Sequence, residues 1–118
     1  MMNKVSPLNC FLTNTEKMVL KEIKEFLNSI LKSRLKLFVL FGSKARGDFN
    51  LESDLDVAVV VRNLNRKLKH QILDEVAEIE FKYSVPVSML LLSEKEFNHL
   101  KQRERRIALD IIRDGIPL

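Results

Sequence analysis

The sequence predicts an α/β fold, a small domain in which a three-stranded sheet is covered by helices. Three observations lead to this prediction. At 118 residues the chain is long enough for one core and too short for two, so we expect a single domain over residues 1–118. Hydrophobic residues make up 46% and charged residues 31%, as in globular proteins. Three short apolar runs alternate with segments whose apolar residues repeat at helical spacing.

The N-terminal part is expected to hold one long helix. Residues 1–12 show no period and contain Pro7, which indicates a tail or an edge element. Thr13 followed by Glu16 fits a capping box. The apolar residues that come next repeat on one face, so we expect an amphipathic helix to about Ser33.

Three apolar runs are expected to be strands. The first covers residues 35–41 and is bounded by Gly42. The second covers residues 54–61 and follows a turn at residues 42–53 that has room for one helical turn. The third, residues 85–92, is almost wholly apolar, as in strands covered by helices. The link of 12 residues between the first two strands permits either pairing direction, so the topology stays open.

Two helical segments complete the pattern. Asn65 is expected to cap a second long helix, which should end before Pro86 because the residue preceding a proline avoids the helical region. Ser93 with Glu96 forms another capping box. Helical sequence with room for one break then continues to Gly115, a C-terminal stop.

Charge and cysteine content suggest where the protein works. A net charge of +4 suits a phosphate-bearing or acidic partner but is too small for a nucleic-acid footprint by itself. The single Cys10 cannot form an internal disulfide, which favours a reducing compartment. No apolar run approaches the ~20 residues of a membrane span, and the N-terminus lacks the pattern of a signal peptide. We therefore expect a cytoplasmic protein without a membrane partner.

Two carboxylates stand at the head of the second strand. Side chains alternate along a strand, so Asp54 and Asp56 point to one face, and Leu55 and Val57 to the other. Neighbouring carboxylates raise each other's pKa unless a cation lies between them. Mg²⁺ is commonly held by one or two carboxylates together with substrate phosphates. The pair therefore indicates a metal, and the metal indicates a phosphorylated ligand.

A turn suited to phosphate directly follows the first strand. Gly42 lets the backbone approach a ligand closely, and the N–H groups after it and the Ser43 hydroxyl can donate to phosphate oxygens. Lys44 and Arg46 supply positive charge beside them. A phosphate-binding turn followed by a metal-binding strand indicates a nucleoside triphosphate site.

The segment GSKARG, followed by SDLD, resembles the Gly-Ser-x-x-Arg-Gly and Ser-Asp-x-Asp motifs of the DNA polymerase β-like nucleotidyltransferase superfamily. The specific motif lies within residues 42–56, while the order of elements is similar over nearly the whole chain. The small size resembles that of the minimal nucleotidyltransferases, which are usually encoded beside HEPN-domain partners. The resemblance implies a nucleotidyltransferase fold with a small mixed sheet.

The resemblance also implies roles. Gly42 and Ser43 are expected to contact the β- and γ-phosphates of the nucleotide, and Asp54 and Asp56 to hold Mg²⁺ as the catalytic pair. Arg46 either contacts phosphate or braces the turn through a carboxylate. Two-metal chemistry would lower the pKa of an attacking hydroxyl and steady the departing pyrophosphate.

One position departs from the family pattern. Active members usually place a third carboxylate on the following core strand, where this chain has VPVSMLLL with Ser88 at the expected place. A serine cannot supply the missing charge and is a poor general base. The third acid is expected from the substrate, from a partner chain, or from Glu94, Asp48 or Glu52; otherwise the domain binds nucleotide without efficient turnover.

The function predicted from the sequence is Mg-dependent transfer of a nucleoside monophosphate, AMP from ATP before other NTPs, to a hydroxyl. By resemblance the acceptor is a tyrosine of a HEPN toxin, which makes the chain a type VII-like antitoxin. The alternative is a catalytically impaired nucleotide-binding module that neutralises or scaffolds a partner by contact. A homodimer stays open, and nucleic acid is not expected as a direct substrate, because no further substrate domain is present.

Overall fold

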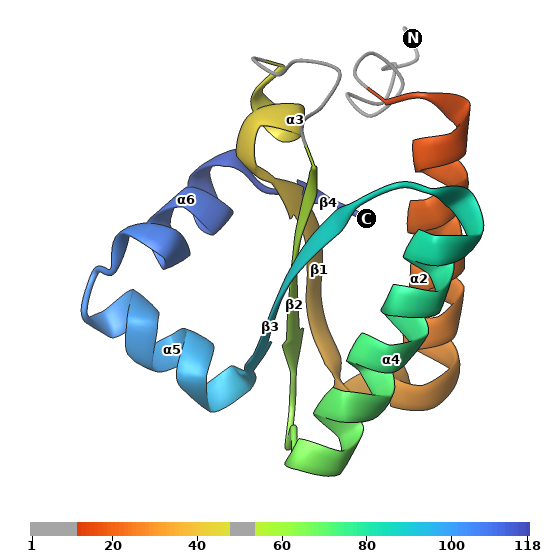
Figure 1. Ribbon diagram of the computed structural model, residues 1–118. Helices are drawn as coiled ribbons and strands as arrows, with labels where there is room; N and C mark the ends of the chain where they lie inside the picture. The colour runs from red at the N-terminus through yellow and green to blue at the C-terminus, as the bar shows by residue number, and fades with distance from the viewer. Residues whose placement is uncertain (1–11, 48–53) are drawn as a thin grey trace, which may run out of the picture.

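The computed structural model describes residues 12–47 and 54–118. Within these residues the chain forms five α-helices, one short 3₁₀ helix and four strands (Figure 1). In chain order they are α2 (Asn14–Leu31), η1 (Lys32–Arg34), β1 (Leu35–Phe41), α3 (Gly42–Arg46), β2 (Leu55–Val61), α4 (Arg66–Tyr83), β3 (Val87–Ser93), α5 (Glu94–Gln102), α6 (Arg106–Asp114) and β4 (Ile116–Pro117).

The strands form one mixed sheet in the order β3-β2-β1-β4. β1 pairs antiparallel with β2 and with β4, while β2 pairs parallel with β3. The pairing directions that the sequence left open are thereby decided, and the α/β class is confirmed.

The predicted number of strands was wrong, because β4 adds a fourth strand to the sheet. Only Ile116 and Pro117 form it, opposite Leu40 and Val39 of β1. Two residues, one of them a proline that cannot donate to a ladder, carry no period that a sequence pattern could reveal.

Helices cover both faces of the sheet, α2 and α4 on one side and α5 and α6 on the other (Figure 1). Side chains alternate along β2, so Leu55, Val57 and Val59 pack in the larger core with α2 and α4. Ala58 and Val60 face the smaller core below α5 and α6. Burial on both faces explains why this strand is apolar nearly throughout.

The predicted helix ends are largely confirmed. Thr13 and Ser93 are N-caps with complete capping boxes, and Asn65 caps α4 through its side chain. α4 ends at Tyr83, and its C-cap Ser84 has a left-handed conformation two residues before Pro86. Gly115 is the C-cap of α6, as expected, but its backbone is extended, with a φ of −63° and a ψ of 131°.

Three details complete the comparison with the predicted elements. The break in the last helical segment separates α5 from α6. The third strand begins at Val87, two residues later than predicted. The prediction for residues 1–12 lies outside the described residues except at Leu12, which is buried in the larger core.

Among the helices described, none is both long and apolar enough to cross a membrane.

Candidate active site

Asp54 and Asp56 lie at the end of the sheet where β1 leads into α3, because Asp56 pairs with Phe41, the last residue of β1. Asp54 directly precedes β2 and is exposed, whereas Asp56 is the second residue of β2 and is partly buried. Leu55 and Val57, on the opposite face, are fully buried. The alternation predicted from the sequence is therefore confirmed, and it turns the Asp56 carboxylate towards α3.

Gly42 brings the turn after β1 against this carboxylate. Phe41, the last residue of β1, pairs with Asp56, which places the first residue of α3 beside it. Gly42 has a φ of +74°, and a Cβ added there would lie 2.4 Å from Asp56 Oδ2. Both the left-handed backbone and the space require glycine. The two halves of the sequence motif are thus in contact.

The pKa of Asp56 is raised above its usual range. Burial is the main cause, and the neighbouring Asp54 carboxylate adds to it. Arg46 and a hydrogen bond from the Ser88 side chain act in the opposite direction. A partly buried carboxylate beside a second one is stabilised by a cation, and oxygen ligands of this kind suit Mg²⁺. The donor set fits the predicted metal.

Lys44 differs from what its position in the turn indicated. The residue is buried, 3% exposed, and its Nζ lies 2.9 Å from Glu16 Oε2 on α2. The same Glu16 side chain accepts the N–H of Thr13 in the capping box. The expected charge beside the phosphates is therefore offset inside the protein, where it ties α3 to the start of α2. No spacing rule could have revealed a pair so far apart in sequence.

Arg46 lies between two carboxylates. Its guanidinium is 3.6 Å from Asp114 Oδ2 at the end of α6, and its charge lowers the pKa of Asp56. The pKa of Asp114 is held below its usual range, chiefly by a hydrogen bond from Arg113 and also by Arg46. Of the two predicted roles, bracing through a carboxylate is seen. The side chain is 44% exposed, so the phosphate contact stays a prediction.

Ser43 belongs to α3, but its side chain lies outside the described part of the structure. Its predicted role in phosphate binding therefore remains a prediction.

Ser88 occupies the position where the third acid was expected. The parallel register of β2 and β3 pairs it with Asp56. Within residues 12–47 and 54–118, no group of three or more metal-ligating side chains is present. The alternative donors Asp48 and Glu52 fall outside the described residues.

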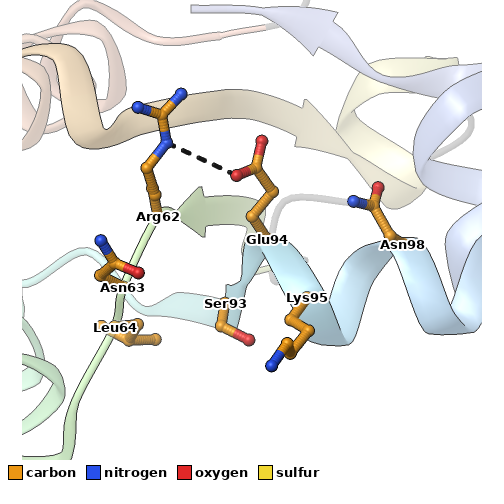
Figure 2. A pocket seen from close by; sticks show the side chains of 7 residues that line it. All are labelled: Arg62, Asn63, Leu64, Ser93, Glu94, Lys95 and Asn98. Atoms are coloured by element: carbon orange, nitrogen blue, oxygen red, sulfur yellow. Dashed lines mark ion pairs between the residues drawn. The ribbon is translucent and has the colours of Figure 1, made fainter.

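Glu94 is excluded as the third acid. It follows the far end of β3, six residues and about 20 Å from Ser88 along the strand. Its carboxylate lies 3.6 Å from Arg62 at the rim of a cavity of about 400 Å³ (Figure 2). This cavity, lined also by Asn63, Lys95 and Asn98, lies at the opposite end of the sheet from the aspartate pair.

Comparison with known proteins agrees with this geometry. The family described as "Nucleotidyltransferase domain" matches residues 20–113. Two relatives come from Methanocaldococcus jannaschii. "Putative protein adenylyltransferase MJ0141" is 36% identical over 74 residues, which cover 62% of this chain and 75% of that protein. "Putative protein adenylyltransferase MJ0604" is 36% identical over 81 residues, which cover 66% of this chain and 77% of that protein.

A solved structure extends the likeness to the fold. The "Structure of putative minimal nucleotidyltransferase" has a TM-score of 0.59, and the alignment covers 99% of this chain and 100% of that chain. At 20% identity this likeness concerns the fold alone.

Proposed function

The chain belongs to the nucleotidyltransferase domain family, and on that premise we propose that it transfers AMP from Mg-ATP to a hydroxyl group of a protein. One observation carries the proposal. Gly42, at the head of the phosphate-type turn, packs directly against Asp56 of the carboxylate pair. A triphosphate bound at the turn would therefore lie beside the metal-binding carboxylates, as nucleotidyl transfer requires.

The residues of the candidate site would have different roles. Asp54 and Asp56 would hold Mg²⁺, which when bound stabilises negative charge on the phosphates. The backbone N–H groups after Gly42 would donate to phosphate oxygens. The acceptor oxygen forms a bond to the α-phosphorus while the bond to pyrophosphate breaks, and pyrophosphate leaves with the electron pair. The hydroxyl proton needs a base, and Ser88 is poorly suited to that role.

The names of the two relatives, both protein adenylyltransferases by description, support a protein acceptor. Resemblance to minimal nucleotidyltransferases supports a HEPN-domain toxin as that acceptor, modified on a tyrosine, with this chain as the antitoxin. A cytoplasmic site of action agrees with the single cysteine.

A second function is favoured by Ser88. Its hydroxyl lies against Asp56 where active relatives usually carry an acid, so the chain could bind nucleotide and neutralise its partner by contact alone. The two functions differ only in turnover.

Transfer of label from α-labelled ATP tests both. The purified chain is incubated with Mg²⁺ and the protein encoded beside it, as wild type, Asp56→Asn and Ser88→Asp. Asp74→Asn is the matched control, because Asp74 is an exposed acid on α4. Label on the partner that is lost only in Asp56→Asn supports the transferase. Label from Ser88→Asp but not from wild type supports the binding module, and label from neither contradicts the transferase.

A further inference from the structure

The outer edge of β3 is long and apolar. The sheet order places β3 at one edge, and its seven residues VSMLLLS include no charge. Edge strands of this kind are normally blunted by charges, prolines or bulges, because their free N–H and C=O groups pair readily with another strand. Among the described residues, no strand pairs with this edge.

The free groups of this edge lie in its middle. Leu55 donates its N–H to the Pro86 carbonyl, so in a parallel ladder the even-numbered residues of β3 bond to β2 and the odd-numbered ones point outward. The outward N–H of Val87 donates to Glu80 Oε2, and that of Ser93 donates to Glu96 Oε1, each at an N···O distance of 2.9 Å. The backbone N–H groups of Met89 and Leu91 are left facing outward, between the two ends at which a carboxylate accepts the N–H.

Apolar surface flanks the edge on both sides. On α4, Leu73 is 37% exposed and lies on the same helical face as Glu80, which reaches the start of the edge. On the α5 side, a hollow of about 570 Å³ is lined by Leu92, His99, Leu100 and their neighbours. Glu96, which caps the end of the edge, also lines this hollow, so the hollow lies beside the edge.

The edge leads into the candidate active site. Ser88 pairs with Asp56 across the parallel ladder, and their side chains share one face of the sheet. A strand added beside β3 would lie about 10 Å from β2, two strand spacings away. A tyrosine, serine or threonine opposite Ser88 would then stand on the same face as the Asp56 carboxylate.

We propose that the acceptor protein docks as an extended strand on the outer edge of β3, with its hydroxyl residue opposite Ser88. This proposal rests on the proposed function and names how its protein substrate is recognised. Side chains on one face repeat every second residue, so the residue opposite Leu92 is four positions from the hydroxyl. That residue is apolar and fills the hollow beside Leu100.

Charge complementarity defines the end of the docked segment next to the site. Asp54, Asp56 and Glu80 gather carboxylates around the start of β3. In the docked segment, a basic residue on the side of the hydroxyl residue away from the apolar one therefore fits the carboxylates around the start of β3. The other end, where Lys69 attracts Glu96, has its charge partly balanced.

The first test is binding of a fluorescein-labelled peptide to the full chain without nucleotide or metal. The peptide carries a tyrosine and a leucine four positions apart, threonines between them, and a lysine beyond the tyrosine. In a control isomer the leucine is moved by one position. Two further peptides are N-methylated on alternate sets of backbone amides. Only one of the two sets of amides faces β3. The peptide methylated on that set should bind at least about tenfold more weakly, and the peptide methylated on the other set less than about threefold more weakly.

Variants of the chain give the second test. Met89→Pro removes one outward N–H, which an edge strand tolerates because that N–H is not used within the sheet. Met89→Ala is the matched control, since it shortens the side chain and keeps the N–H. We expect Met89→Pro to weaken binding by about fivefold or more relative to Met89→Ala. If Met89→Pro does not fold, the N-methylated peptides decide with the wild-type chain.

The outcomes separate docking from chemistry. Equal effects of the two N-methylated sets, equal binding by the two Met89 variants, or no saturable binding at about 1 mM peptide would overturn the docking proposal. The same peptides are then tested for label transfer from α-labelled Mg-ATP. Edge-dependent binding without transfer leaves docking standing and contradicts the transferase. Transfer that is unaffected in Met89→Pro supports the transferase and overturns docking.

Discussion

Replacing Gly42 with alanine adds one methyl group at the point where the turn after β1 meets the carboxylate pair. The φ of +74° costs a residue with a Cβ about 1–2 kcal/mol. The new Cβ would lie 2.4 Å from Asp56 Oδ2 and 3.1 Å from Asp56 Cβ and Cγ, so the carboxylate must move. Overpacking of this kind costs roughly 1–3 kcal/mol.

The two costs together lower the free energy of unfolding of Gly42→Ala by roughly 2–5 kcal/mol. A domain of this size has about 5–15 kcal/mol in total, so the variant should still fold. Urea unfolding at neutral pH, without metal, measures the loss directly. A thermal scan should show Tm lowered by about 4 °C for each kcal/mol.

A double-mutant cycle isolates the contact with Asp56. In the Asp56→Ala background the carboxylate is gone and only the contact with the remaining Cβ, at 3.1 Å, is kept. Gly42→Ala should then cost little more than the backbone part, about 1–2 kcal/mol. The difference between the two backgrounds is the coupling of the turn to the carboxylate. If Gly42→Ala costs the same in both backgrounds, the turn does not press on Asp56, and the turn and the carboxylate pair do not form one site.

Three further predictions concern the charged groups around the turn. The pKa of Asp56 is raised in the folded chain, so ionisation of Asp56 lowers the stability of the fold as the pH rises through that pKa. Asp56→Asn should therefore be more stable than wild type at pH 7 without metal. In pH-dependent thermal scans this difference should vanish below the ordinary pKa of 3.8. Lys44→Met leaves Glu16 buried without its ammonium partner and should lower the free energy of unfolding in urea by about 3–5 kcal/mol. Adding Glu16→Gln should recover most of that loss. A loss below about 1 kcal/mol in Lys44→Met would contradict the importance of the ion pair. Arg46→Ala should lower the free energy of unfolding by less than about 1 kcal/mol, because the ion pair of Arg46 with Asp114 is partly exposed. The same variant should bind Mg-ATP more weakly in calorimetry. An unchanged affinity would leave Arg46 a purely structural role.

Much of the local structure could be predicted from neighbouring residues. The boxes at Thr13 and Ser93 and the Asn65 cap depend on groups within four positions of each other. The Asp56 side chain points to the face opposite the buried Leu55, and this follows from strand alternation alone.

The candidate site was predicted less completely. Gly42 and the aspartates could be named from their motif, but their contact depends on the pairing of β1 with β2. Lys44 was expected to face a phosphate, because nothing local in the sequence shows that Glu16 lies within reach.

The sequence by itself determined where the capped helices begin, which face of the second strand is apolar throughout, and which residues could bind phosphate and metal, because these properties act over a few residues of chain. Only the tertiary structure decided the strand directions, the fourth strand, the pairing of Ser88 with Asp56 and the far position of Glu94. Each of these depends on contacts between segments distant in the chain, and such contacts are selected by the packing of the whole core.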